Sequence, residues 1–398
     1  MSARRDFDVL IAGAGMVGAG LAALLSTGEA TRALRIALVD PKPALAPLPG
    51  EPLDARVSAL SRAGERVLRQ TGAWPLLALR QPCAYERMVI WDSGAAVGGR
   101  DTLVFDAAEV GEPNLGHIVE NRAVAAALVE RAIAGGVTLL RSTVTGLDLT
   151  RDVATVMLGE RALAVGLVVA ADGADSPLRH LAGLGGEPTA YAQEAIVAHL
   201  RPAESHRGTA HQRFLPAGPL ALLPLADGTV SLVWSTTPAQ AERLVALDDA
   251  AFASEVTRAS DGVLGTLTPV TGRSRFPLRR FNAASYAATR LALVGDAAHT
   301  VHPLAGQGVN QGFLDVAALV MELGAALARG GDPGDPQPLA RYARARRAEN
   351  ALMGAALDGI YRLFSSDRPL LMQARQLGLG LASRAGPLKR LLVERALC

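Results

Sequence analysis

Cysteine is scarce in this 398-residue chain: only Cys83 and Cys398 occur, and they form no CxxC pair. This scarcity argues against a disulfide framework, a zinc site and an iron–sulfur cluster, and it fits a reducing cytoplasm. An excess of one charge sign is also missing, because 40 Lys and Arg residues balance 38 Asp and Glu residues. The balance argues against a strongly basic nucleic-acid-binding protein and against an acidic disordered chain.

Long hydrophobic runs are missing as well. The longest charge-free apolar run, residues 9–25, is interrupted by four glycines and falls just short of the roughly 18 residues that a membrane helix needs. No signal-type cleavage region follows it. The next apolar stretch, residues 313–328, contains Asp315 and Glu322. We therefore expect no membrane-spanning segment.

The pattern that is present alternates strands with helices. A strand at residues 8–12, a helix from about residue 16 and a strand at 34–39 are typical of a βαβ unit. Short apolar runs at 167–171 and 291–294 are typical of buried strands. The sequence therefore predicts an α/β body with a parallel sheet.

Between residues 190 and 275 the pattern changes to strands in series. We expect four of them, with Ala226-Asp227-Gly228 as a hairpin turn, at residues 195–200, 209–215, 220–225 and 229–235. Consecutive strands without intervening helices predict an antiparallel sheet, here inserted as a second domain. A Gly- and Pro-rich loop at 330–336 precedes a helical C-terminal region rich in Leu and Arg.

A glycine-rich motif, GAGMVG at residues 13–18, follows the first predicted strand. Gly13 permits a tight turn, Gly15 lets the backbone approach a pyrophosphate, and Gly18 allows close packing of helix on strand. The N-terminus of the next helix would bind the phosphates through its N–H groups and dipole. Asp40 ends the second strand, where a carboxylate can accept hydrogen bonds from ribose hydroxyls. These features predict a dinucleotide site but do not separate NAD from FAD.

Two later elements also follow buried strands. Asp172-Gly173 permits a backbone turn against a ligand, although an ordinary left-handed turn gives the same pattern. Gly295-Asp296 places a carboxylate where it can accept from sugar or ribityl hydroxyls. A loop of small residues at 303–308 then leads into a helix beginning near Val309, whose N-terminus would stabilise an anionic reduced flavin.

Two histidines, His299 and His302, lie beside that loop. They allow a metal-binding or general-base interpretation. The alternative, which is the commoner role at such positions, is that they brace the loop through hydrogen bonds.

Together these motifs resemble those of single-component FAD-dependent aromatic hydroxylases with the para-hydroxybenzoate hydroxylase fold. More narrowly, the chain resembles the ubiquinone-biosynthesis hydroxylases at residues 54–60, 72–74, 111–122, 276–278, 358–364, 377–379 and 386–392. The resemblance covers essentially the whole chain. It implies a Rossmann-like FAD-binding body at 1–75, 116–185 and 276–335, an inserted antiparallel-sheet substrate domain at 76–115 and 186–275, and a basic helical region at 336–398.

The resemblance further implies which residues hold FAD. They are Gly13, Gly15, Gly18 and Asp40 at the ADP half, Arg56 and Arg122 at the pyrophosphate or flavin side, Asp172 and Asp296 at the pyrophosphate and ribityl region, and Pro303, Gly306, Gly308 and Asn310 at the isoalloxazine. Two alternatives stay open. Arg56 could be a surface-loop arginine, and Arg122 could cap a helix while pairing with Glu120.

The reaction implied by the resemblance needs few side chains. NAD(P)H acts as a transient reductant of FAD, dioxygen adds to give a C4a-hydroperoxide, and an OH group passes to the ring of a polyprenyl phenol. Only one GxGxxG motif follows a strand, so a second stable nucleotide domain is not expected. The sequence identifies no catalytic base; His211, Arg213 and Tyr191 are candidates.

Apolar side chains of the predicted antiparallel sheet suit either a polyprenyl lining or an ordinary core; they are Phe214, Leu222, Leu223, Leu225, Leu232 and Trp234. Residues 341–398 carry 11 basic and 4 acidic side chains, a net charge of +7, among many leucines. Such a segment suits peripheral contact with the inner membrane or with a quinone-biosynthesis complex. The alternative is a helix packed on the FAD-binding body. Hydroxylation of another aromatic or isoprenoid substrate, and a flavin-binding accessory subunit without turnover, also stay open.

Overall fold

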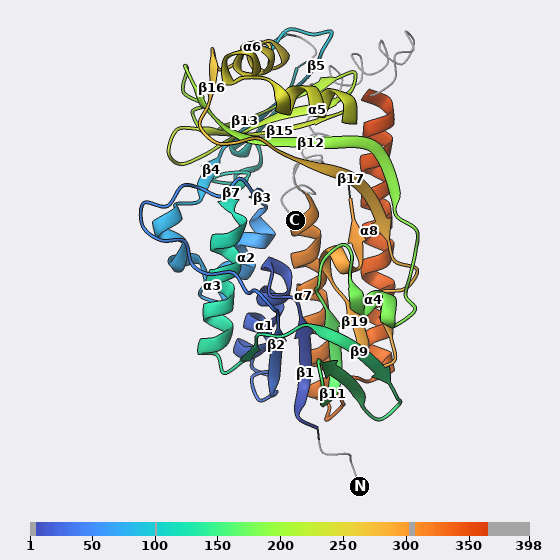
Figure 1. Cartoon of the computed structure of the whole chain (residues 1–398). Helices are drawn as coiled ribbons and strands as arrows, with labels where there is room; N and C mark the ends of the chain where they lie inside the picture. Colours follow the sequence, from blue (N-terminus) through green and yellow to red (C-terminus); the bar gives the residue numbers. More distant parts are fainter. Residues whose placement is uncertain (1–4, 100–101, 302–306, 365–398) are drawn as a thin grey trace.

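The structure is a computed structural model that describes residues 5–99, 102–301 and 307–364. Figure 1 shows two halves, with a large antiparallel sheet above a parallel sheet and its helices. The helices are α1 (Met16–Thr27), α2 (Arg62–Gln70), α3 (Asn121–Ala134), α4 (Pro177–Leu181), α5 (Pro238–Ala246), α6 (Asp249–Ala259), α7 (Gln307–Leu327) and α8 (Pro336–Phe364), with 3₁₀ turns η1 (Trp74–Arg80), η2 (Ala107–Val110) and η3 (Gly295–Ala297).

The lower half contains the parallel sheet, in the order β18-β19-β11-β1-β2-β8, with β10 and β9 added beside β11. The strands from β19 to β8 run parallel. Their bounds are β1 (Phe7–Ala12), β2 (Ile36–Val39), β8 (Thr138–Leu140), β9 (Val144–Leu149), β10 (Ala154–Leu158), β11 (Arg161–Ala170), β18 (Ala287–Ala288) and β19 (Leu291–Leu293). Because parallel neighbours end at one edge, the loops after β1, β2, β11 and β19 come together there.

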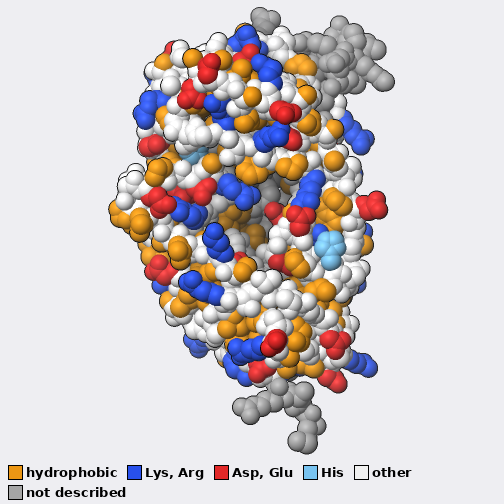
Figure 2. Space-filling model, viewed as in Figure 1, with side chains coloured by type: hydrophobic (Ala, Val, Ile, Leu, Met, Phe, Trp, Pro, Cys, Tyr) orange, Lys and Arg blue, Asp and Glu red, His pale blue; other side chains and the backbone are white. Residues whose placement is uncertain are grey.

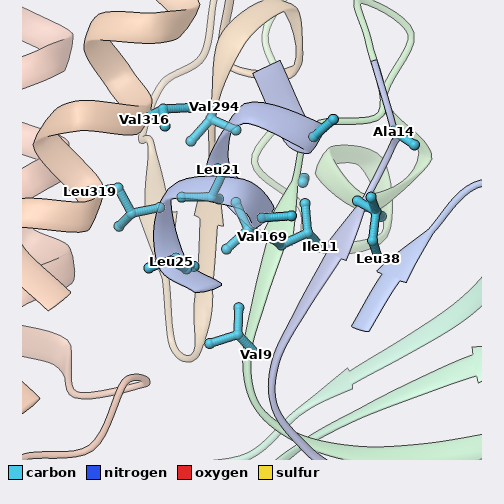
Figure 3. Packing of buried hydrophobic residues seen from close by; sticks show 14 of the residues in the cluster. Val9, Ile11, Ala14, Leu21, Leu25, Leu38, Val169, Val294, Val316 and Leu319 are labelled. Carbon is cyan, nitrogen blue, oxygen red and sulfur yellow. The ribbon is translucent and has the colours of Figure 1, made fainter. Parts of the chain in front are cut away.

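The core of this half lies between the sheet and α1. Leu21 and Leu25 of α1 pack between α7 and the central strands, together with Ile11 and Val169 (Figure 3). All four side chains are fully buried. Burial on both faces explains why the central strands are continuous apolar runs rather than alternating ones.

The upper half is a nine-stranded sheet in the order β20-β17-β12-β15-β14-β13-β5-β6, with β16 beside β12. Only β5 and β13 pair in parallel. The bounds are β5 (Arg87–Asp92), β6 (Leu103–Asp106), β12 (Thr189–Pro202), β13 (Thr209–Leu215), β14 (Gly218–Pro224), β15 (Val230–Thr236), β16 (Leu267–Pro269), β17 (Ser274–Asn282) and β20 (His299–Thr300). Helices α5 and α6 lie on its upper face (Figure 1).

A third, small sheet, β3-β7-β4, and the long helix α8 join the two halves. The strands are β3 (Val57–Leu60), β4 (Cys83–Tyr85) and β7 (Gly116–Glu120). Helix α8 runs alongside both halves (Figure 1), and its Phe364 ring stacks on Phe214 of β13 with centroids 3.9 Å apart.

The α/β class with an added antiparallel sheet is confirmed, and every predicted strand exists with ends shifted by a few residues. Two strands are longer than predicted: β11 begins at Arg161 because its first half pairs with β10, and β12 begins at Thr189, where it pairs with β17. Residues 226–228 form the predicted turn, with the Gly228 N–H donating to the Leu225 carbonyl at 3.1 Å. The division into six domain segments stays a prediction.

The four predicted strands follow one another without an intervening helix, as β12 to β15, but α5 and α6, which lie between β15 and β16, were not identified from the sequence. Their start signals are visible in hindsight. The side chain of Thr237 caps α5 by accepting from the Gln240 N–H, and Asp248 caps α6 by accepting from the Ala251 N–H. Both residue types favour the N-cap position because their oxygen accepts from a free backbone N–H.

Candidate functional site

The glycine-rich loop between β1 and α1 needs its three glycines for different reasons. Gly13 has φ +101°, and a Cβ there would lie 2.2 Å from the carbonyl oxygen of Ala171. A Cβ on Gly18 would lie 2.0 Å from the carbonyl oxygen of Gly13. Gly15 differs, because no atom lies within 4 Å of its Cβ position. Gly13 and Gly18 thus serve packing, whereas Gly15 faces open space.

That open space lies at the N-terminus of α1. Gly15 is the N-cap, and no side chain caps the helix. The first N–H groups of a helix lack intrahelical acceptors and carry the positive end of the helix dipole. A phosphate fits such a position, so the arrangement suits the predicted pyrophosphate contact.

Asp40, directly after β2, braces this loop. One carboxylate oxygen accepts from the Ala14 N–H at 2.8 Å, and the other accepts from the Lys42 N–H at 2.7 Å. Each oxygen has a second lone pair, so binding of ribose hydroxyls remains compatible with this geometry. The bracing role was not foreseen from the sequence.

Asp172, beyond the end of β11, has one oxygen in use and one free. Its Oδ2 accepts from the Leu178 N–H at 3.1 Å, at the start of α4. Its Oδ1 is buried without a hydrogen-bond partner among the described residues. Burial raises the pKa of this carboxyl group and outweighs the effects of Ser176 and Leu178, which act to lower the pKa. A buried oxygen without a donor is costly, so this acceptor is suited to a ligand.

Asp296, in η3 beyond β19, lies at the same edge of the sheet. Its side chain is exposed to solvent although protein surrounds it on most sides, which is the environment of a cleft wall. This enclosure raises the pKa of Asp296, while the charges of His299, Arg56 and Arg279 act to lower it. Figure 2 shows the surface hollowed at mid-height between the two halves, with charged side chains around the hollow.

Arg56 approaches that carboxylate from the segment before β3. Its guanidinium lies 5.7 Å from the ring centroid of Phe276, which belongs to β17. The side chain is exposed, and its charge acts on Asp296. Arg279 was not singled out from the sequence; it acts on Asp296 too and pairs with Asp175 at 2.7 Å.

Arg122 is held by acidic neighbours. Its Nη2 lies 2.8 Å from Glu51 Oε1, and its Nε lies 3.5 Å from Glu120 Oε1. The pairing with Glu120 considered as the alternative is therefore present. A contact between Arg122 and a phosphate stays a prediction.

The remaining predicted residues lie at or before the start of α7. The Asn310 side chain is buried; its Nδ2 donates to the Ala59 carbonyl and its Oδ1 accepts from the Ser61 N–H, both at 2.9 Å. It thereby fastens α7 to the end of β3. The Cβ position of Gly308 is open. His302, Pro303 and Gly306 lie outside the described residues.

A buried network behind η3 was missed by the sequence reasoning. Asp315 of α7 is fully buried, and its Oδ2 accepts from the Gly295 N–H at 3.0 Å and lies 2.5 Å from His299 Nε2. Its Oδ1 accepts from Arg346 Nε at 2.7 Å and Asn350 Nδ2 at 3.1 Å. Burial alone would raise the pKa of Asp315, but His299 and Arg346 hold it below its usual value. The sequence signal that could have revealed this network was an acidic residue inside an otherwise apolar stretch of helix.

The contact of His299 with Asp315 favours the bracing interpretation, here through a carboxylate rather than through the backbone. No group of three or more His, Cys, Asp or Glu side chains that could hold a metal occurs among residues 5–99, 102–301 and 307–364.

The candidate bases do not gather at the cleft. By strand register His211 pairs with Leu222, which packs in the cluster beneath α5 and α6. His211 and Arg213 therefore both lie on the sheet face that α5 and α6 cover, since Arg213 Nη1 donates to the Ala259 carbonyl at the end of α6. The Tyr191 hydroxyl donates to Asp358 of α8 at 2.5 Å.

The same strand register places the apolar side chains of the sheet on two opposite faces. Leu222, Leu232 and Trp234 belong to the core under α5 and α6, as in the ordinary-core interpretation. Phe214 packs against α8, while Leu223 and Leu225 pack with Ala59 and Ile118 of the small sheet. Only this second group, on the lower face, lies toward the cleft.

Comparison with known proteins defines the class. A family model described as an FAD binding domain matches residues 6–354. Among solved structures, the p-nitrophenol 4-monooxygenase PnpA from Pseudomonas putida superposes with a TM-score of 0.77 at 18% identity, covering 98% of each chain. PqsL from Pseudomonas aeruginosa superposes with a TM-score of 0.75 at 22% identity, covering 94% of this chain and 99% of that one. The fold is that of the FAD-dependent monooxygenases.

Closer relatives narrow the family. The chain is 40% identical to the ubiquinone hydroxylase UbiL of Rhodospirillum rubrum, over 100% of this chain and 90% of the relative. It is 37% identical to the 3-demethoxyubiquinol 3-hydroxylase of Escherichia coli, over 98% of both. It is 33% identical to the human mitochondrial ubiquinone biosynthesis monooxygenase COQ6, over 98% of this chain and 92% of the relative. The chain belongs to the ubiquinone-biosynthesis FAD-dependent hydroxylases.

Proposed function

We propose that this protein is an FAD-dependent, NAD(P)H-reduced monooxygenase that hydroxylates the aromatic ring of a polyprenyl phenol in ubiquinone biosynthesis. The observation that carries the proposal is the gathering of three features at one sheet edge. They are the open helix N-terminus at Gly15, the free oxygen of Asp172 and the carboxylate of Asp296. These lie beyond the carboxyl ends of β1, β11 and β19, which are adjacent parallel strands. That edge is where α/β folds bind nucleotides.

The bound FAD supplies the hydroxylating chemistry with dioxygen, and the chain supplies position and a dry pocket. Backbone N–H groups at Gly15 would bind the pyrophosphate. Asp40, Asp172 and Asp296 would accept hydrogen bonds from FAD hydroxyls or from water near them. Arg56 would supply positive charge near Asp296, and side chains on the lower face of the nine-stranded sheet would line the pocket.

Purified protein tests this proposal in two measurements. We expect a yellow protein with non-covalent FAD, and NAD(P)H oxidation that a polyprenyl phenol stimulates in proportion to hydroxylated product. Flavin without substrate-stimulated oxidation would favour the accessory-subunit alternative. The intermediate that accumulates in a deletion strain identifies the missing step, and an intact quinone pathway there would favour another aromatic substrate.

Membrane or complex association belongs to the same proposal. No helix among the described residues is long and apolar enough to cross a membrane. Residues 365–398 lie outside the described part, so the expectation for this basic, Leu-rich segment rests on its sequence. Truncation before Asp367 removes six basic residues. We expect it to keep FAD while losing salt-sensitive binding to anionic vesicles and quinone synthesis in vivo. Flavin-free or insoluble protein would instead indicate a structural strap.

A further inference from the structure

Four exposed leucines lie on two segments that hydrogen bonds join, and we call them the leucine rim. Leu45 and Leu48 belong to the proline-rich loop before β3, and Leu76 and Leu79 belong to η1. Their exposed fractions are 67%, 69%, 39% and 75%. Single exposed leucines are ordinary on protein surfaces, but four on adjacent segments call for an explanation.

The two segments form one surface because Arg80 joins them. Its Nη1 donates to the Glu51 carbonyl at 2.5 Å and its Nη2 donates to the Leu48 carbonyl at 3.1 Å. Leu76 and Leu79 are three residues apart in a 3₁₀ turn, so they lie on the same side. The Arg80 guanidinium thus donates its hydrogen bonds to the loop, and the side chains that the rim exposes are hydrocarbon.

A pocket of about 340 Å³ begins at this rim. Leu79 belongs to both. The pocket has a mixed lining: the other apolar residues are Pro52, Leu53, Val57, Ile118, Leu225 and Ala226, and the polar ones are Glu51, Arg80, Gln81, Glu120 and Asp227. Leu225 stands at the turn between β14 and β15, so the pocket reaches from the outer loop to the large sheet. Its volume is within the range of small-molecule sites.

We propose that the leucine rim docks on the surface of a lipid bilayer and lets a lipid-soluble substrate pass from the bilayer into this pocket. The inference rests on the proposed function, because a polyprenyl phenol resides in the membrane. Exposed leucines without directional donors suit insertion among acyl chains and headgroups.

Charge around the rim favours an anionic bilayer. Lys42 is exposed in the same loop, and Arg66 is exposed on α2; Arg69 is exposed there too, but it pairs with Glu65 at 2.7 Å. The Arg69 guanidinium lies 4.8 Å from the ring centroid of Trp74, at the start of η1. Glu51, an acid of the same loop, is paired with Arg122. Four side chains also cover far less than the roughly 1,200 Å² that a stable contact with a second copy buries.

The test compares two matched double variants of the full chain. Leu45→Ser with Leu48→Ser alters the rim without touching the pocket lining. Met321→Ser with Leu352→Ser is the control, because these residues are 65% and 62% exposed on α7 and α8. Each protein is sedimented with vesicles of phosphatidylethanolamine and phosphatidylglycerol. Each is also assayed with a long-chain polyprenyl phenol in those vesicles and with a short-chain, water-soluble analogue.

We expect the rim variant to lose vesicle binding and vesicle-dependent turnover by about tenfold, with turnover of the short-chain analogue unchanged and the control variant like the wild type. Equal vesicle binding and turnover by both variants would overturn the inference. So would a wild type that ignores vesicles, or a rim variant that changes only the solution mass from dimer to monomer. Absence of turnover on both substrates by the wild type would refute the proposed function instead, while sedimentation still decides the role of the rim.

Discussion

Replacing Gly15 with valine separates cofactor binding from folding. The structure has no atom within 4 Å of the Gly15 Cβ position, and the residue has φ −69°, which any L-residue adopts. The apoprotein should therefore lose at most about 1 kcal/mol of unfolding free energy, the usual effect of a poorer N-cap residue. The new side chain would occupy the space predicted for the pyrophosphate. We expect flavin retention to be abolished.

The magnitude follows from the contacts that the phosphate would lose. Charge-assisted hydrogen bonds contribute about 1.5–3 kcal/mol each. Loss of two such bonds from the N-terminus of α1 weakens FAD binding by about 3–6 kcal/mol, or roughly 100- to 20,000-fold in Kd. Gly18→Ala is the matched control. Its Cβ would lie 2.0 Å from the carbonyl oxygen of Gly13, so it should destabilise the apoprotein itself by about 3 kcal/mol.

The assay measures two quantities for each variant. Urea unfolding of the apoprotein gives stability, and quenching of flavin fluorescence on titration gives the Kd for FAD. We expect a wild-type unfolding midpoint with a lost flavin signal for Gly15→Val, and a lowered midpoint for Gly18→Ala. Full flavin occupancy in Gly15→Val would refute the pyrophosphate assignment. An unfolding midpoint as low as that of Gly18→Ala would refute the reasoning about open space.

Three further predictions concern buried or enclosed polar groups. Asp296→Ala should weaken FAD binding by about 1–3 kcal/mol, measured by titration; unchanged affinity would move the ribityl contact elsewhere. Asp315→Asn should lower the unfolding free energy by about 3–5 kcal/mol, because Arg346 loses its buried partner, whereas Tyr342→Phe, which removes one hydrogen bond to Leu293, should cost about 1 kcal/mol. Burial, with a smaller effect of His206, lowers the pKa of His211 to about 4. The unfolded chain then binds the proton first, so stability should fall by about 3 kcal/mol between pH 6.5 and 4, and His211→Leu should flatten that part of the pH profile.

Local chemistry explains why the parallel sheet and the glycine loop could be predicted from sequence. Residues 9–12 are apolar because β1 is buried on both faces, and the tight turn between β1 and α1 explains Gly13, with φ +101°, and Gly18, whose Cβ would meet the Gly13 carbonyl. Such constraints act between neighbours in the chain or between regular elements. The hairpin at 226–228 is local in the same sense, because a turn type fixes its own residues. The close approach of the Ala171 carbonyl to Gly13 comes from beyond β11, and only the structure showed it.

Long-range contacts decided the buried polar pairings and the two faces of the large sheet. The partner of Asn310 is the end of β3, about 250 residues earlier, and Asp315 meets Arg346 from α8. An acid inside an apolar helix marks Asp315 as unusual, but no local pattern identifies Arg346 as its partner or the end of β3 as the partner of Asn310, because these contacts join segments far apart in the sequence. The two faces of the nine-stranded sheet are another case. A period of two in the sequence marks opposite faces, but only packing against α5, α6 and α8 determined which face holds the core and which faces the cleft.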